Sequence, residues 1–228
     1  PRRGPAVAGV TYAAFGPGWC FAINGFSFIA VIAGLALMKL PRQTPQKARI
    51  SARAGLAEGF RYVLTEPAVR TLILIVGVVN LFGTSFATLL PAWAVDVLGG
   101  DVRTNGLLRA AQGAGALSGA LALASLGRSK LRGRLLTLGT FLFPLLLLGF
   151  SFIRWIPSAL IVLAFIGVSV VLVMNLCNAL VQSTVPDALR GRVMSIYSLV
   201  MFGLFPLGSL VMGSVAEAAS EPTAIRLS

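Results

Sequence analysis

The chain has 228 residues, of which 57% are hydrophobic and only 11% are charged, and its formal net charge is +12. A soluble domain of this length cannot bury so much apolar surface, so the composition excludes an ordinary soluble fold and indicates a membrane protein. The charge does not indicate a nucleic-acid partner, because the Lys and Arg residues stand between apolar runs and not along one face of a domain.

Six apolar segments are long enough to cross a hydrocarbon core of about 30 Å, which takes roughly 20 helical residues. In chain order we predict spans at residues 19–38, 71–95, 106–126, 135–153, 158–182 and 193–216. The apolar run at 4–15 is too short to cross, and residues 223–228 stop where another segment would start. We therefore expect a fragment of an all-α polytopic protein, with a partial helix at each end.

The connectors between the spans alternate in charge. Residues 39–70, 127–134 and 190–192, together with the residues flanking them, hold thirteen Lys or Arg and three acids, whereas the intervening connectors hold two Arg and four acids. Lys and Arg in short loops stay on the cytoplasmic side during insertion. We therefore predict that span 19–38 runs from outside to inside and that Glu217 lies outside.

The longest connector, residues 39–70, has near-helical spacing of charges in its middle, at Arg49, Arg53, Glu58 and Arg61. One interpretation is an amphipathic helix on the inner membrane surface, where anionic lipid attracts cations. The other is a solvated linker between two helical bundles. Both make this connector a boundary between parts of the protein.

The residue inventory argues against an enzyme. The chain has no histidine, and Cys20 and Cys177 both lie in predicted spans, far apart in sequence. No phosphate-binding loop or nucleophile elbow occurs, and the carboxylates do not cluster at metal-ligand spacing. We expect neither a catalytic site nor a bound metal or cofactor.

Arg109 is the sharpest single position, because it lies about one turn inside a predicted span, where an ionised group is costly unless it faces protein or water. One interpretation is an anchor whose charge reaches the outer interface. The other is a cavity residue paired with Asp96 at the end of the preceding span, which would form an outer gate or an anion-recognising pair.

Three amides, Asn175, Asn178 and Gln182, share one stripe of the 158–182 helix. We expect this stripe to face the bundle interior, where it either lines the transport route or bonds neighbouring helices; the second use is favoured for Gln182. Asn80, midway along span 71–95, is a further cavity candidate.

Other residues in the spans suggest packing and interfacial roles. Trp19, Trp93 and Trp155 suit the aromatic belt at the membrane interface. Phe82 and Phe86 are expected to face lipid or a bulky lipophilic substrate. Gly115 and Gly119 form a small-residue face, which indicates close helix packing or a surface that slides between half-bundles.

Three segments resemble motifs of the major facilitator superfamily, in the bacterial exporter branch that includes enterobactin and macrolide efflux proteins. Residues 4–9 resemble the tail of the antiporter motif in helix five, with Gly4, Pro5 and Gly9 matching and Ala8 in place of a glycine. Residues 127–134 resemble the basic Gly-Arg loop between helices eight and nine. Residues 186–194 resemble the loop between helices ten and eleven, and this match is the most specific.

The resemblance implies a major facilitator type helical bundle. Residues 1–38 would be the end of the N-terminal bundle, 39–70 the cytoplasmic central loop, and 71–228 the C-terminal bundle up to the start of helix twelve. The residues implied as gates or conformational motifs are Gly4, Pro5, Gly9, Asp96, Arg128, Arg134, Asp187, Arg190, Gly191 and Arg192.

The function implied by the resemblance is secondary active transport by alternating access. We expect proton-coupled efflux of a small lipophilic molecule, such as a drug, macrolide or siderophore, across the bacterial inner membrane. The expected partners are membrane lipid, the substrate and the N-terminal half of the same transporter. An importer, or a scaffold or receptor of the same fold, is the alternative.

Overall fold

The computed structural model describes residues 17–38, 52–125, 131–218 and 225, and every element assigned within them is helical. Contacts between residues divide the chain into two units, 1–49 and 50–228. In the first unit, α2 spans Pro17–Ala36 and matches the span predicted at 19–38. Its apolar side chains, such as Phe28, Ile32 and Leu35, are exposed. Such a surface suits lipid or the apolar faces of other helices.

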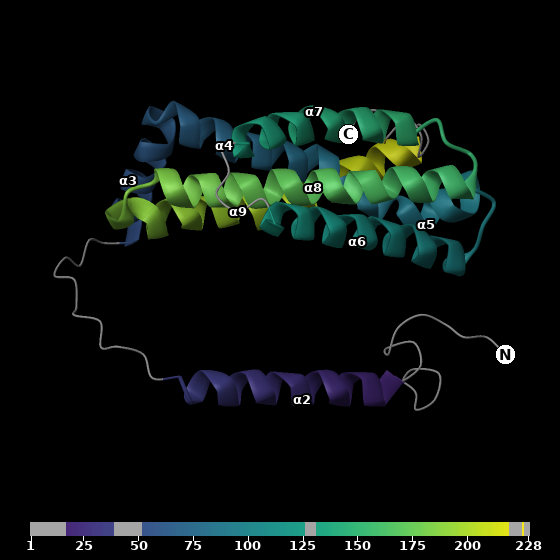
Figure 1. Cartoon of the computed structure of the whole chain (residues 1–228), viewed down its shortest axis with the longest axis horizontal. Helices are drawn as coiled ribbons and strands as arrows, with labels where there is room; N and C mark the ends of the chain where they lie inside the picture. The colour runs from purple at the N-terminus through teal and green to yellow at the C-terminus, as the bar shows by residue number, and fades with distance from the viewer. Residues whose placement is uncertain (1–16, 39–51, 126–130, 219–224, 226–228) are drawn as a thin grey trace. The chain divides into compact units, whose positions relative to one another are not determined.

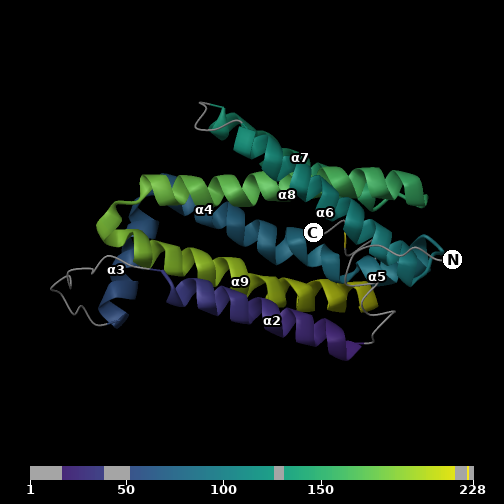
Figure 2. The same cartoon turned by 60° about the horizontal axis from the view of Figure 1, so that its bottom comes forward.

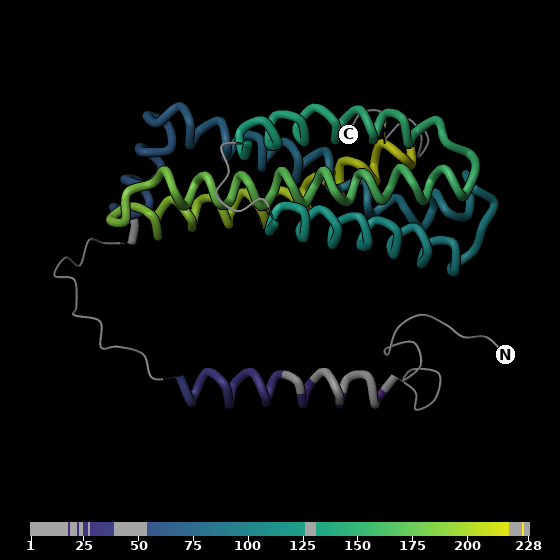
Figure 3. The backbone as a smooth tube through the Cα atoms, in the orientation of Figure 1, coloured from purple at the N-terminus to yellow at the C-terminus, as the bar shows by residue number. Residues whose placement is uncertain are grey.

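The second unit is a bundle of antiparallel helices (Figures 1 and 2). Its elements are α3 (Ala52–Thr65), α4 (Pro67–Val78), η1 (Val79–Gly83), η2 (Thr84–Thr88), α5 (Leu90–Ala92), η3 (Trp93–Val97), α6 (Val102–Ser125), α7 (Arg132–Phe150), α8 (Ile156–Thr184) and α9 (Asp187–Ala218). Within the described residues, five helical stretches are long and apolar enough to cross a membrane, the first being Pro67–Val97. They confirm the five spans predicted after residue 70, and Figure 3 traces their alternating path.

Proline and glycine set several helix boundaries. Glu66 and Trp155 are extended and precede Pro67 and Pro157, which stand in the first turn of α4 and α8. Proline suits this position because it has no N–H to leave unsatisfied. Gly99 closes the first span with a φ of 61°, which favours glycine because it has no Cβ.

The helices α6 and α8 cross at very short range. A methyl group at Gly115 would overlap the backbone carbonyl of Ala164, and one at Gly167 would overlap that of Gln112. At Gly119 the added carbon would lie 3.1 Å from the Cα of Val168. The small-residue face therefore packs against a helix of its own bundle, which favours the packing interpretation over a surface sliding between half-bundles.

The first span of this unit is irregular beyond residue 78. It changes from α-helix to a π-helical turn at Val79–Gly83, to 3₁₀ at Thr84–Thr88, and to a second π-helical turn at Trp93–Val97. Changes of this kind frequently mark functional positions in helices. The sequence predicts the span but not these changes in pitch.

The middle of the long connector is a helix, as one of the two interpretations predicts. Gly55, Gly59 and Val63 are buried on α3, whereas Leu56 and Phe60 are exposed on another side. At Gly59 an added carbon would lie 3.0 Å from the Cβ of Arg192 in α9. Contacts thus join α3 to the helices that follow it, and the division between the units falls at residues 49 and 50.

Candidate functional site

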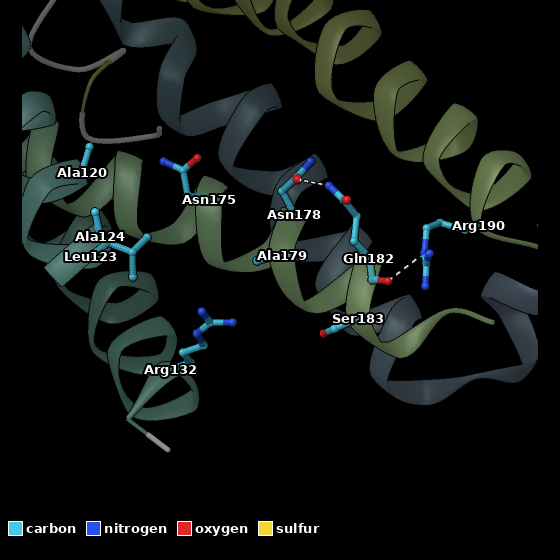
Figure 4. Close-up of a pocket in the computed structure, with 10 residues that line it drawn as sticks. All are labelled: Ala120, Leu123, Ala124, Arg132, Asn175, Asn178, Ala179, Gln182, Ser183 and Arg190. Atoms are coloured by element: carbon cyan, nitrogen blue, oxygen red, sulfur yellow. Dashed lines mark hydrogen bonds between the residues drawn. The ribbon is translucent and has the colours of Figure 1, made fainter. Parts of the chain in front are cut away.

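A polar pocket of about 800 Å³ lies among α6, α7, α8 and α9 (Figure 4). Its volume is within the range of small-molecule sites, roughly 300–1,000 Å³. Its polar lining comes from Arg132, Asn175, Asn178, Gln182, Ser183 and Arg190, and its apolar lining from Ala120, Leu123, Ala124 and Ala179. This pocket is the candidate functional site.

The pocket lies toward one end of the bundle. Arg132 begins α7, and Arg190 lies in the first turn of α9. Both belong to connectors that the positive-inside pattern assigns to the cytoplasmic side. Asn175 stands nine residues before the end of α8, about 13 Å along the helix axis at 1.5 Å per residue. The polar lining thus runs along the bundle from this end, and Asn175, Gln182 and Ser183 in it are exposed.

The amide stripe of α8 faces this pocket. The Gln182 amide Nε2 donates to Asn178 Oδ1 at 2.6 Å, and Asn175 Nδ2 donates to the Val171 carbonyl at 3.0 Å. Both bonds lie within α8, so neither of them joins α8 to a neighbouring helix. Asn175 and Gln182 are exposed and Asn178 is half-buried, so the expectation that the stripe faces the bundle interior is wrong for Asn175 and Gln182. All three residues line the pocket, and their part in a transport route stays a prediction.

Arg190 holds the turn between α8 and α9. Its Nη2 lies 2.6 Å from the Asp187 carboxylate, and its Nε donates to the Gln182 carbonyl at 2.9 Å. It therefore satisfies a carbonyl at the end of α8 while it contributes to the pocket wall. Gly191 is exposed, with open space where a Cβ would lie.

Arg192 pairs with the connector helix. Its Nη1 contacts the Glu58 carboxylate of α3, 134 residues earlier in the chain. The sequence places both residues at cytoplasmic positions but does not predict the pair, because nothing in the local pattern signals a partner so distant. The contact ties α3 to the first turns of α9.

Arg109 lies in α6 and contacts the irregular span. Its Nη2 donates to the Ala87 carbonyl at 2.9 Å. Ala87 belongs to the 3₁₀ segment, where the α-helical bonding pattern is interrupted. Asp96 is exposed, and within the described residues no salt bridge joins it to Arg109. In place of the predicted pairing with Asp96, Arg109 therefore has a backbone carbonyl as its partner.

Asn80 lies outside the pocket. It is buried in the π-helical turn, where its Nδ2 donates to the Val76 carbonyl at 2.9 Å. Its own backbone carbonyl accepts from Ser85 Oγ at 2.9 Å. These bonds satisfy polar groups at the change of pitch, and the role predicted for Asn80 in a cavity stays a prediction.

An aromatic cluster corrects two further predictions. Trp93 and Phe86 are fully buried, so Trp93 does not stand in an exposed aromatic belt and Phe86 does not face lipid. The Trp93 ring stacks on Phe150 at 5.1 Å between centroids, and the Arg154 guanidinium lies 5.4 Å from the centre of the Trp93 ring. Trp155 is exposed, as the belt prediction expects. Burial of Trp93 depends on its partner in α7, which hydropathy does not reveal.

Several predicted residues fall elsewhere. Arg134 is exposed on α7 and does not line the pocket. Gly4, Pro5, Gly9 and Arg128 lie outside the described residues. Across the ranges that the structure describes, no group of three or more His, Cys, Asp or Glu residues is arranged to hold a metal ion.

Comparisons with known proteins agree on one family. The family model described as "Transmembrane secretion effector" matches residues 2–228. The multidrug efflux pump Tap of Mycolicibacterium fortuitum is 24% identical over 95% of the chain, and the protein of the same name in Mycobacterium tuberculosis is 28% identical over 95%. The chain spans about half of these relatives, 53% and 52% of their lengths. No solved structure gives a significant match.

Proposed function

The chain belongs to the transmembrane secretion effector family of the major facilitator superfamily, and from this premise we propose that it forms the second half of an efflux transporter. It is a multi-pass membrane protein of a transporter family. The proposed substrate is a small lipophilic molecule such as a drug. The proposed mechanism is alternating access, in which this bundle rocks against an N-terminal bundle around a site between them.

The polar pocket is the observation that carries the proposal. Amides and guanidinium groups are expensive on a lipid-facing surface and are therefore expected where they meet protein, water or substrate. Here they gather around a space of about 800 Å³ that extends along the bundle from one end. A substrate entering from the cytoplasm would meet this lining first, which suits export.

We also propose the bacterial inner membrane as the location of the protein and the proton gradient as its driving force. The positive connectors orient the chain as an inner-membrane protein would be oriented. Proton coupling normally requires a carboxylate inside the membrane, and within the described spans the acids, Asp96, Asp187 and Glu217, stand near the ends. We therefore place the coupling carboxylate in the N-terminal half, which is also the proposed partner of this bundle.

Efflux of a fluorescent drug analogue from intact cells tests the proposal. Cells expressing the full transporter that contains this chain should retain less dye than cells without it, and a protonophore should abolish the difference. Higher dye accumulation with the protein would establish an importer. Equal accumulation across a panel of dyes and drugs, with the protein present in the membrane, would favour a scaffold.

A further inference from the structure

We propose that Asn105, Arg109 and Gln112 of α6 form a second polar site, which the substrate contacts between the pocket and the outer side of the membrane. The site takes lipophilic substrates that carry hydrogen-bond acceptor oxygens. This inference rests on the efflux function proposed above. Arg109 is exposed, and Asn105 and Gln112 are half-buried. All three lie in the first half of α6, which the alternation of charge places toward the outside.

Two exposed sides of α6 differ in chemistry. Arg109 and Gln112 follow Asn105 by four and seven residues, which is the spacing of one helix face. The large exposed apolar residues of α6 share another side of the helix: Leu107, Leu117 and Leu121. Leucines suit lipid, whereas a guanidinium is costly on a lipid-facing surface. The polar face is therefore expected to meet water, protein or substrate.

The polar face of α6 leads into the pocket. At the same helical spacing it continues toward the cytoplasmic end through Ala116, Ala120 and Leu123, which are eleven, fifteen and eighteen residues after Asn105. Ala120 and Leu123 line the pocket (Figure 4). One side of a single helix thus joins the pocket to Arg109. A substrate that leaves the pocket along this side meets the second polar site next.

The hydrogen bond of Arg109 argues against an anchor that reaches for the outer interface. Arg109 lies ten residues after Gly99, which stands between two spans. Ala87, whose carbonyl accepts from Arg109 Nη2 at 2.9 Å, lies twelve residues before Gly99. Counted along the chain, the acceptor is no nearer to the outer end than Arg109 itself. The bond thus holds the guanidinium beside the neighbouring span, at the depth of the polar face.

The second polar site offers donors and no acid. A guanidinium carries five N–H donors, and one of them serves the Ala87 carbonyl. Within the described residues no salt bridge compensates Arg109. The Asn105 Oδ1 atom is buried and has no hydrogen-bond partner among the described residues, so a ligand hydroxyl or water is needed to satisfy it. Substrate oxygens match this set, whereas a permanent cation would be repelled by Arg109.

The first test asks whether the polar face meets water. In the full transporter, with the native cysteines replaced by alanine, Gln112→Cys should react much faster than Leu117→Cys with a charged, membrane-impermeant thiol reagent added to intact cells. Leu117→Cys is the matched control, because Leu117 is exposed on the other side of the same helix. Ala116→Cys repeats the measurement if Gln112→Cys does not reach the membrane. Equal rates on the two sides would overturn the inference.

The second test compares chloramphenicol, a neutral drug with hydroxyl, amide and nitro oxygens, with ethidium, a permanent cation of similar size. We expect the unmodified transporter to export chloramphenicol with the lower KM. Arg109→Met should raise this KM about tenfold, which corresponds to the loss of roughly 1.4 kcal/mol of binding, and should leave the KM for ethidium unchanged or lower it. Gln112→Leu, which leaves the bond from Arg109 to Ala87 in place, should raise the KM for chloramphenicol by a smaller factor. Arg103→Met removes an exposed cation one turn before Leu107, on the other side of α6, and should change neither KM.

Other results overturn the inference in distinguishable ways. Preferential export of ethidium by the unmodified transporter, or export of other drugs but of neither compound, would reject the substrate class while leaving efflux intact. An equal rise of both KM values in Arg109→Met, with no change in Gln112→Leu, would assign Arg109 to helix packing alone. Absence of export for any dye or drug would reject the efflux function itself, and the inference with it.

Discussion

The α6–α8 pair and the Pro67–Val97 span, which lie in the same bundle, are built in opposite ways. The pair consists of two continuous α-helices that approach through glycines, whereas the span changes its pitch four times. In the span, polar groups such as Asn80 and Ser85 occupy buried positions. The pair is a rigid joint, because its backbones already touch. We expect the span to deform more readily, because its α-helical bonding is interrupted.

The largest effect is expected from a substitution at the crossing of α6 and α8, and it tests whether this crossing is rigid. Gly115→Ala places a methyl group on the Ala164 carbonyl, and the three nearest atoms are all backbone atoms of Ala164 in the regular helix α8. Overpacking typically costs 1–3 kcal/mol and sometimes more. We expect about 3 kcal/mol, which would lower the thermal midpoint of the detergent-solubilised protein by roughly 6–12 °C.

Gly113→Ala is the control for that experiment. It makes the same change on the same helix, where an added Cβ meets nothing within 4 Å. It should be neutral or slightly stabilising, since alanine favours a helix by up to about 1 kcal/mol over glycine. Equal midpoints for the two variants would mean that α6 and α8 are not locked together.

A second glycine tests the deformable side. Gly208 of α9 packs against the Leu81 carbonyl, within the π-helical turn. Gly208→Ala should cost less than Gly115→Ala, about 1–2 kcal/mol, because the irregular backbone is able to move away. Thermal midpoints of both variants, with Gly203→Ala as the control, measure the difference. A cost at Gly208 as large as that at Gly115 would break the comparison.

Arg109 links the two regions, since it lies on α6 and donates to Ala87 in the span. Arg109→Met keeps an unbranched, flexible side chain but removes the donor. A hydrogen bond to a charged group contributes about 1.5–3 kcal/mol when shielded, and the exposure of Arg109 reduces this to about 1 kcal/mol. We expect a midpoint lower by about 2–4 °C.

The local nature of this effect is measurable with a cysteine introduced at Thr88, which is exposed next to Ala87. Its rate of modification by a membrane-impermeant thiol reagent should rise in Arg109→Met. Arg103→Met, which removes an exposed cation one turn and a half earlier, should leave the rate unchanged. An unchanged rate in Arg109→Met would show that the bond does not hold the 3₁₀ segment.

The same comparison explains how much the sequence predicts. Spans are predictable because a bilayer imposes length and apolar composition on each helix, and the glycines of α6 mark close packing directly. The changes of pitch are not predictable, because they depend on neighbours such as Phe143 and Gly208 that contact the span from other helices.

The candidate site follows the same division. The amide stripe was predictable because its three residues share one helix face. The pocket around it was not, because Arg132 and Arg190 come from other helices. Burial of Trp93 and the partner of Arg192 were missed for the same reason: each depends on a contact far away in sequence.

The smallest expected effect concerns the connector that joins the two regions, where α6 begins. The Asp101 carboxylate accepts from the Thr104 N–H at 3.0 Å, and the Asp101 N–H donates to Thr104 Oγ1 at 3.2 Å. The hydrogen bond from the Thr104 backbone N–H to the ionised carboxylate lowers the pKa of Asp101 below its ordinary value.

A lowered folded-state pKa gives stability that is present above the unfolded value of 3.8 and is lost as pH falls through the folded value. Asp101→Ala should therefore lower the thermal midpoint slightly at neutral pH, and by less as the pH falls below 3.8. Asp101→Asn should retain most of the midpoint at neutral pH, since asparagine caps helices about as well as aspartate. Because this cap fixes only the first turn of α6, its loss should leave the modification rate at Thr88→Cys unchanged; a raised rate would mean that the start of α6, and not Arg109 alone, restrains the deformable span.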